Sequence, residues 1–273
     1  MRRVAAEGAA LALGLGLAAS ACASPADRFA QRALALGFQQ SVVPGTGFAH
    51  VLFRRSGHPA GTLHVYLDGD GTPWLAGRPA ADPTPGRDLV LALMALDPAP
   101  SVYVGRPCYH GLADTPPCAP TLWTSARYSD AVVQSIAGAT ARLARDAGAQ
   151  RVVWLGYSGG GTLAVLAAPR VAASVAVVTV AANLDTDAWI ELHGFRPLTA
   201  SLNPARQRQL PAGLFQRHYV GGRDRLVPEG VVRRGPIDGN SVRVVPDCDH
   251  DSCWKALWPA ILEEVRRGVG GDG

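Results

Sequence analysis

One serine of the chain lies in a glycine-rich setting that is typical of an activated nucleophile. Residues 156–160 read Gly-Tyr-Ser-Gly-Gly and place Ser158 at the centre of a Gly-x-Ser-x-Gly pattern. A serine hydroxyl is a poor nucleophile unless a base takes its proton during the attack. In such a turn the chain reverses so sharply from strand to helix that flanking side chains would clash, and the serine is exposed in a strained conformation. The pattern predicts Ser158 as the nucleophile of an acyl-transfer reaction.

The residues around this motif favour a nucleophile over a plain turn. In a chain with 31 glycines, Gly-x-Ser-x-Gly can also arise in an ordinary loop. Here residues 151–155 form an apolar, β-branched run that predicts a buried strand, and residues 162–168 have the composition of a helix. A strand that leads into the turn and a helix that leaves it are what the chemistry requires.

An acid and a histidine follow the serine in the order that a catalytic triad needs. Asp224 comes after a predicted strand at 215–220, and His250 comes after a predicted strand at 241–245. Asp224 would accept a hydrogen bond from the imidazole and hold its tautomer. The other ring nitrogen would take the Ser158 proton and later return it to the leaving group. We therefore predict Ser158, Asp224 and His250 as the catalytic residues.

Both partners of the serine have a structural alternative. Asp224 ends a Gly-Gly-Arg-Asp run and is also suited to a simple turn, in which case Asp185 or Asp249 would supply the acid. His250 lies between two aspartates and could be a solvated side chain.

Two places are expected to supply backbone N–H groups for an oxyanion hole. The first is Gly159, because the start of the helix after the turn directs its N–H toward the substrate. The second is the Leu-Asp-Gly-Asp-Gly turn at 67–71, where we predict the N–H of Asp70, with Gly69 as the neighbouring choice. The alternatives are a tight Asp/Gly turn or a fragment of a calcium loop, whose full Asp-x-Asp-x-Asp-Gly series is absent.

Through these residues the chain resembles the α/β-hydrolase family. The resemblance rests on the turn at 156–160, the acid, the histidine and the Asp-Gly-Asp-Gly run, and it covers roughly residues 48–267. More narrowly, the Tyr-Leu-Asp-Gly-Asp-Gly run at 66–71 is similar to one in secreted or lipid-anchored serine hydrolases of Gram-negative bacteria. The resemblance implies cleavage of a carboxylic ester through an acyl-serine intermediate. The His-Gly-Gly-Gly oxyanion motif of many lipases and esterases is missing, so the resemblance does not extend to their substrates.

The order of the expected elements indicates an α/β fold in a single domain. Strands and helices alternate through the middle and end of the chain, which is typical of a mostly parallel sheet with helices on both faces. Residues 48–54 and 62–67 read as strands and are expected to form an antiparallel pair that opens the sheet. We place a peripheral lead-in segment at 22–47, the hydrolase domain at 48–267 and a cleft-covering segment at 183–211.

The nature of the acyl group is not encoded in a recognisable motif. The segment at 183–211 and the loop between Cys108 and Cys118 are expected to wall the site. Trp189 and Phe195 indicate an apolar acyl pocket, so the expected substrate is a small-molecule or lipid-like acyl ester.

The beginning of the chain is typical of an exported protein. Arg2 and Arg3 precede an apolar stretch at 9–19 that is too short for a stable membrane anchor, so residues 1–21 are interpreted as a signal peptide. The Ala-Ser-Ala-Cys run that ends at Cys22 resembles a lipobox, in which the cysteine is lipidated. The alternative is ordinary cleavage after the small-residue triplet. We expect a lipoprotein anchored by its lipid on the periplasmic side of a bacterial membrane, or otherwise a soluble periplasmic or secreted protein.

Four further cysteines form an even set, as expected for an oxidising compartment. We predict the local pairs Cys108–Cys118 and Cys248–Cys253, because each brackets a short Pro- or Asp-containing loop. The alternative is a zinc site, but neither spacing is the usual Cys-x-x-Cys.

The charge and the remaining motifs exclude several classes of function. The net charge is +4, but the basic residues are dispersed arginines with Lys255 as the single lysine, so no nucleic-acid partner is expected. No metal, nucleotide or flavin motif is present, and no cofactor is predicted. The competing hypotheses are an amidase, thioesterase or acyltransferase with the same residues, and a non-catalytic envelope lipoprotein that keeps the fold for binding.

Overall fold

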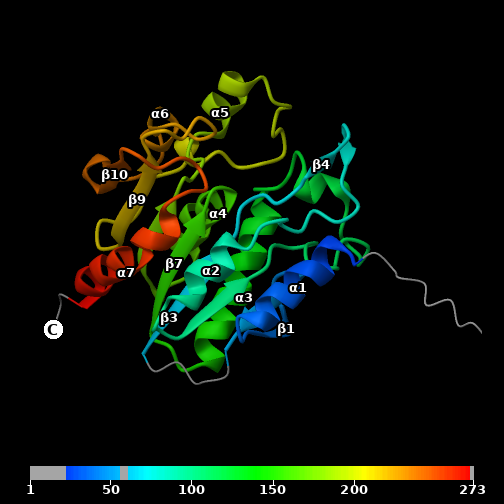
Figure 1. Ribbon diagram of the computed structural model, residues 1–273, viewed down its shortest axis with the longest axis horizontal. Coiled ribbons are helices and arrows are strands. Elements are labelled where there is room, and N and C mark those ends of the chain that lie inside the picture. Colours follow the sequence, from blue (N-terminus) through cyan, green and yellow to red (C-terminus); the bar gives the residue numbers. More distant parts are fainter. Residues whose placement is uncertain (1–22, 56–60, 271–273) are drawn as a thin grey trace, which may run out of the picture.

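The computed structural model describes residues 23–55 and 61–270. The predicted signal peptide and Cys22 lie outside the described residues. The described chain forms an eight-stranded sheet in the order β1-β2-β6-β3-β7-β8-β9-β10, with helices packed against both faces (Figure 1). The predicted α/β fold class is confirmed.

The sheet is mostly parallel. Six neighbouring strands from β6 to β10 run in one direction, while β2 is antiparallel to both β1 and β6. A separate small hairpin, β4 and β5, lies beyond the carboxyl end of β3. The strands are β1 Gln39–Pro44, β2 Ala49–Arg54, β3 Thr62–Leu67, β4 Trp74–Leu75, β5 Arg78–Pro79, β6 Ser101–Val104, β7 Arg151–Tyr157, β8 Ser174–Val180, β9 Phe215–Gly221 and β10 Val242–Val245.

The start of the sheet differs from the expectation in its pairing. The opening strands are antiparallel, but the pair is β1 with β2, in register from Gln39 opposite Arg54, and not 48–54 with 62–67. Strand β6 lies between β2 and β3, so these two strands are not neighbours. The sheet therefore begins within the segment that we expected to be a peripheral lead-in. Strand β1 is an edge strand that buries only Val43. Because its other residues are exposed or partly exposed, its sequence lacks the apolar pattern that predicts a strand.

Helices on the two faces complete two layers of core. The apolar side chains of α3 and α4 pack on one face, and those of α1, α2 and α7 pack on the other. Short helices α5 and α6 follow β8 and β9 at the upper edge of the view (Figure 1). The helices are α1 Pro25–Ala35, α2 Leu89–Ala95, α3 Asp130–Asp146, α4 Gly159–Ala167, α5 Thr186–His193, α6 Glu229–Val232 and α7 Trp254–Gly270.

Strand β7 is the central support of the site, and its side chains explain why it lies there. Val152 and Trp154 point into the core layer of α3 and α4, while Val153 and Leu155 point into the opposite layer. A strand that is apolar on both faces is stable only between two layers of helices. Every residue of the following helix α4 is buried as well, so the turn between them is held rigidly from below.

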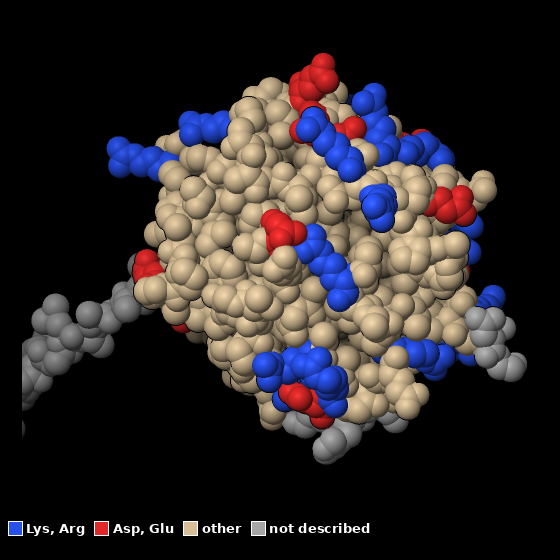
Figure 2. Space-filling view, turned by 180° about the vertical axis from the view of Figure 1, so that it is seen from behind, with Lys and Arg blue, Asp and Glu red and all other residues tan. Residues whose placement is uncertain are grey.

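The structure brings together both predicted cysteine pairs. The Cα atoms of Cys108 and Cys118 lie 5.5 Å apart and those of Cys248 and Cys253 lie 5.8 Å apart, within the range that a disulfide requires. Within the described ranges, no helix has the length and apolar character needed to span a bilayer. On the face shown in Figure 2, Lys and Arg side chains form separate groups divided by uncharged surface.

Candidate active site

Ser158 lies at the sharp turn between β7 and α4. Its backbone has φ 50° and ψ −123°, a region that non-glycine residues rarely adopt, and its N–H donates to the carbonyl oxygen of Val180 at 2.8 Å. Residues in such conformations persist only where the surroundings hold them, and they cluster at functional sites.

The glycines of the motif are required by close approach of the backbone. A Cβ on Gly156 would lie 2.6 Å from the carbonyl oxygen of Gly160, and a Cβ on Gly160 would overlap the carbonyl oxygens of Leu67 and Asp68. A side chain at 156 would therefore push α4 away from β7, and one at 160 would push α4 away from the end of β3. This is the steric requirement inferred from the sequence.

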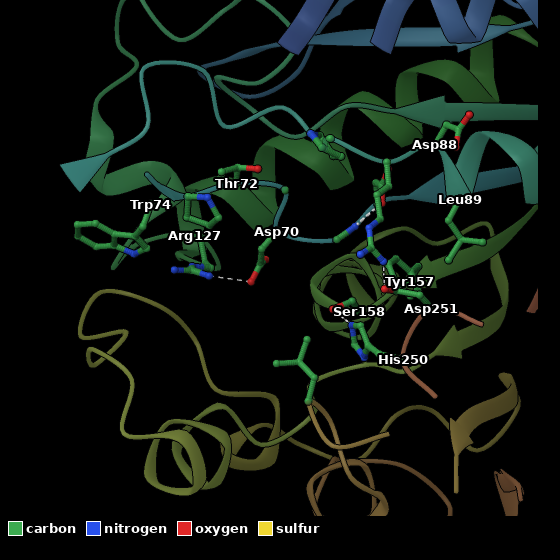
Figure 3. A pocket seen from close by; sticks show the side chains of 18 of the residues that line it. Asp70, Thr72, Trp74, Asp88, Leu89, Arg127, Tyr157, Ser158, His250 and Asp251 are labelled. Atoms are coloured by element: carbon green, nitrogen blue, oxygen red, sulfur yellow. Dashed lines mark hydrogen bonds and ion pairs between the residues drawn. The ribbon is translucent and has the colours of Figure 1, made fainter. Parts of the chain in front are cut away.

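His250 and Asp224 meet Ser158 in a continuous chain of hydrogen bonds. His250 Nε2 lies 3.1 Å from Ser158 Oγ, and His250 Nδ1 lies 2.8 Å from Asp224 Oδ2 (Figure 3). The Asp224 side chain is fully buried, and its Oδ1 accepts the backbone N–H groups of Leu226 and Val227 at 2.9 and 2.8 Å. A carboxylate can only accept, so Nδ1 carries the proton and Nε2 presents its lone pair to the serine.

The loop that carries His250 is fixed from several sides. The indole of buried Trp254 donates to the His250 carbonyl oxygen at 2.9 Å. The Tyr157 ring lies 5.3 Å from the imidazole, and its hydroxyl donates to Asp251, which also pairs with Arg87. The histidine therefore has little freedom to leave Ser158.

The two other candidates for the acid serve local turns. Asp185 caps α5 by accepting the N–H groups of Asp187 and Ala188 at 3.2 Å each. Asp249 accepts the N–H groups of residues 251 and 252 within its own loop. Neither is hydrogen-bonded to His250, so Asp224 is the carboxylate that the fold delivers to it.

The turn after β3 lies directly against the serine. A Cβ on Gly69 would be 3.4 Å from Ser158 Cβ. The N–H of Gly69 donates to the Asp68 carboxylate at 2.7 Å, which removes it as an oxyanion donor. In the described part of the chain, the N–H of Asp70 has no hydrogen-bond acceptor. The N–H of Gly159 is one of the unpaired donors that begin every helix.

The Asp70 side chain is held by residues that the sequence did not single out. We name Asp70, Arg106, Tyr109, Arg127 and Tyr128 the Asp70 cluster. The carboxylate accepts from Arg106 Nη1 at 2.5 Å, Arg127 Nη1 at 2.8 Å and the Tyr128 hydroxyl at 2.7 Å. The Tyr109 hydroxyl donates to the Asp70 carbonyl oxygen at 2.9 Å. Both the main chain and the side chain of Asp70 are thus held in place. The residues that hold them lie 36 to 58 positions away in the sequence.

Two neighbouring carboxyl groups of the turn differ in their electrostatics. Burial favours the neutral form of Asp70, but Arg127 and Arg106 outweigh this effect and hold its pKa well below the usual range. Burial raises the pKa of Asp68 to about 7, although its bonds to Gly69 and Tyr103 act in the opposite direction. Asp70 is therefore ionised at neutral pH, and Asp68 is poised to titrate.

A pocket of about 1350 Å³ opens over Ser158. It extends on one side toward Trp74 and Arg127 and on the other toward Asp88 and Leu89 (Figure 3). The segment at 183–211 contributes four lining residues, Trp189, Phe195, Arg196 and Leu198.

The loop between Cys108 and Cys118 has another position than expected. None of its residues lines the pocket. It passes behind the turn after β3, where Tyr109 reaches Asp70, so it supports the site and does not wall it. Within residues 23–55 and 61–270, no three His, Cys, Asp or Glu side chains are grouped so as to hold a metal ion.

Comparison with known proteins gives matches at the level of structure. No family model matches the sequence, and no curated protein matches it. An esterase from Pyrococcus furiosus superimposes with a TM-score of 0.59 at 12% identity, covering 86% of this chain and 93% of the esterase. A putative α/β-hydrolase of unknown function from Agrobacterium tumefaciens gives 0.57 at 12% identity, with coverage of 86% and 98%. EstE5, whose crystal was soaked with p-nitrophenyl butyrate, gives 0.56 at 15% identity, with coverage of 96% and 95%. The sheet order, the strand–turn–helix at Ser158 and these superpositions together show that the chain has the α/β-hydrolase fold.

Proposed function

We propose that the protein is a serine hydrolase that cleaves a carboxylic ester, or a related acyl bond, through an acyl-Ser158 intermediate. The observation that carries the proposal is the hydrogen-bond chain from Ser158 Oγ through His250 to Asp224, at 3.1 and 2.8 Å, under an open pocket. These distances are those that nucleophile, base and orienting acid need.

In the first step Ser158 attacks the acyl carbon of the substrate. As Oγ forms its bond to carbon, His250 Nε2 takes the hydroxyl proton. Asp224 stabilises the imidazolium that results, and its bonds to two backbone N–H groups keep it in place. The strained turn presents Oγ to the pocket, so no rearrangement of the chain is needed before attack.

The negative charge that develops on the carbonyl oxygen requires fixed donors. The N–H groups of Gly159 and Asp70 are suited to this role, since one begins α4 and the other has no acceptor among the described residues. The positive end of the helix dipole adds to the stabilisation. Gly69, our neighbouring choice, is unsuited because its N–H is bonded to Asp68.

The tetrahedral intermediate then collapses and expels the leaving group. His250 gives its proton to the leaving oxygen, and a water molecule, activated by the same nitrogen, hydrolyses the acyl-enzyme. The products are a carboxylic acid and an alcohol.

We propose an ester rather than an amide or thioester as the substrate, although the fold itself serves all three. One structural neighbour is an esterase and another is a membrane phospholipase A, but an acylaminoacyl peptidase from Pyrococcus horikoshii is also among them. A non-catalytic role is disfavoured because a binding module has no need for the strained serine and its aligned histidine.

A fluorophosphonate probe tests the proposal directly. The purified protein is expected to be labelled at Ser158, and the label is expected to disappear in Ser158→Ala. Ser174→Ala is the matched control, because Ser174 begins β8 away from the pocket. Wild-type protein that is folded by circular dichroism and takes up no label would rule out the enzyme.

Export and lipidation remain proposals from the sequence. Metabolic labelling with a fatty-acid analogue is expected to mark the wild type and not Cys22→Ser. Label retained by Cys22→Ser would exclude this cysteine as the lipid attachment site.

A further inference from the structure

The two ends of the pocket differ in their charges. We name the side toward Trp74 the Trp74 end and the side toward Leu89 the Leu89 end (Figure 3). The Leu89 end contains Asp88 and Asp251, and Asp251 is paired with Arg87. Lys255, at the start of α7 and close to Asp251 in the chain, also lines the pocket, so the acidic and basic side chains of this end are equal in number. The Trp74 end contains Arg127 and Arg196 together with the carboxylate of Asp70, and Asp68 of the same turn also lines the pocket.

Arg127 has donors left over for a ligand. Its Nη1 bonds to Asp70 at 2.8 Å and its Nε donates to the Thr124 carbonyl oxygen at 2.8 Å. Its Nη2 has no acceptor among the described residues, although the side chain is only 8% exposed and lines the pocket. A guanidinium donor that faces a cavity without a partner is suited to an anionic ligand.

Arg196 provides a second cation at the same end. Its guanidinium lies over the Trp74 ring, 4.5 Å from the ring centroid. In the part of the chain that the structure describes, it forms no ion pair and no side-chain hydrogen bond. Stacking on the indole holds the charge in place and leaves its edge free for hydrogen bonds.

The buried charges next to this end are not balanced. Arg106 and Arg127 are 3% and 8% exposed, and both contact the single ionised carboxylate of Asp70. Asp68 is the other carboxyl group nearby, and burial raises its pKa to about 7, which favours its neutral form and weakens its compensation of the second positive charge. Excess buried charge is unfavourable, and an anion in the pocket would relieve it.

The position of His250 decides which part of an ester occupies the Trp74 end. The leaving oxygen must lie at His250 Nε2 to receive its proton, so the alcohol extends past the histidine. Trp74 and Arg127 lie on the other side of Ser158, beyond the Asp70 turn (Figure 3). The acyl chain therefore points toward the Trp74 end. The Trp74 ring gives this end apolar surface for a short hydrocarbon stem.

We propose that the substrate's acyl chain ends in a carboxylate, which Arg127 and Arg196 bind while its hydrocarbon stem packs on Trp74. The substrate class is thus the half-ester of a dicarboxylic acid. Water and the half-ester react to give the dicarboxylate, the free alcohol and one proton. The inference rests on the proposed hydrolase function and names its substrate.

Kinetics on a matched pair of esters test the inference. The pair is the mono-4-nitrophenyl ester of adipic acid and the same compound with its free carboxylate methylated, which differ in charge and little in length. The readout is the ratio of kcat/KM, anionic over neutral. We expect Arg196→Gln to lower this ratio about tenfold, the effect of losing one charge-assisted hydrogen bond, and Arg127→Met to lower it at least as much. Arg208→Gln is the control, since this exposed arginine of the same segment does not line the pocket and is expected to leave the ratio unchanged.

A binding measurement separates this inference from the proposed catalysis. Calorimetric titration of Ser158→Ala with monomethyl adipate is expected to show binding that dimethyl adipate lacks and that Arg196→Gln weakens. If both esters are turned over and neither arginine variant changes the anionic-over-neutral ratio of kcat/KM, the carboxylate site is refuted. The proposed hydrolase function is then still supported. Arginine-dependent binding without turnover of any ester would support the site and refute the hydrolase. Preference for a phosphonate of equal length would refute the carboxylate assignment.

Discussion

The hydroxyl of Tyr128 lies 2.7 Å from both carboxylate oxygens of Asp70. This contact joins the start of α3 to the turn that faces Ser158. A Cβ on Gly159 would overlap the Asp70 carboxylate, so this carboxylate packs directly on the first turn of α4. A carboxylate at this place would oppose a developing oxyanion unless its charge were neutralised. Arg106 and Arg127 supply the neutralisation, and the tyrosine hydrogen bond helps to hold the Asp70 side chain in position.

Tyr128→Phe is expected to lower kcat for an ester about tenfold and to change KM little. The lost hydrogen bond is expected to loosen the Asp70 turn, whose N–H we propose as an oxyanion donor that acts in the transition state and not in the bound substrate. Steady-state kinetics provide the measurement. Tyr219→Phe is the matched control, because Tyr219 donates to Glu264 on the far side of the sheet and is expected to leave kcat unchanged. An equal effect of both variants would contradict a specific role for Tyr128.

Asp224→Asn is expected to lower kcat by about 10³- to 10⁴-fold, because an amide favours the wrong imidazole tautomer and leaves the imidazolium unstabilised. The fold is expected to survive, as an amide oxygen can still accept from Leu226 and Val227. Circular dichroism and kcat are the two measurements. Asp249→Asn serves as the control in the same loop as His250. Near-normal turnover of Asp224→Asn would show that another group orients the histidine.

The free energy of unfolding is expected to fall as the pH drops from 7 to 5. Burial lowers the pKa of His50 to about 4 and the pKa of His110 and of His218 to about 3. The unfolded chain binds these protons near pH 6.5 and the folded chain does not, so each histidine lowers stability by about 1 kcal/mol per pH unit on average in this window, with a limit of about 1.4 below pH 6. Asp68, with its raised pKa, acts in the opposite direction, but one carboxyl is outweighed by three imidazoles.

Denaturant titrations at several pH values measure this dependence. His218→Asn is expected to reduce its mean slope between pH 7 and 5 by about 1 kcal/mol per pH unit, whatever the variant's stability at pH 7. A wild-type stability that is constant between pH 7 and 5 would show that the three histidines are not neutral in the fold.

Removal of the Cys108–Cys118 pair by a double serine variant is expected to lower the free energy of unfolding by about 3 kcal/mol, the loop-closure entropy of a ring of this size. The sequence separation is 10 residues. Because Tyr109 lies in this loop and holds the Asp70 carbonyl oxygen, kcat is expected to fall as well. Denaturant midpoints and kcat are compared with those of the oxidised wild type, in which the Cys108–Cys118 bridge is intact. Unchanged midpoints would indicate that buried packing alone holds the loop.

Local patterns in the sequence were sufficient for the α/β class, for the strand–turn–helix at Ser158 and for the order of acid and histidine. These features depend on residues close together in the chain: an apolar strand, glycines that allow close approach, and polar residues just after strand ends. Such short-range constraints are recorded directly in residue type and spacing. The edge strand β1 could not be predicted from the sequence, because a strand that buries only one side chain has almost no apolar pattern.

The tertiary structure alone decided how distant residues meet at the site. It brought His250 to Ser158 across 92 positions, and Arg106 and Arg127 to Asp70 across 36 and 57. It also showed that the Gly69 N–H is used by Asp68, and that a pair of dispersed arginines becomes a cationic end of the pocket. Burial and charge pairing depend on which strands are neighbours in the sheet, and a linear pattern of residues does not contain that information.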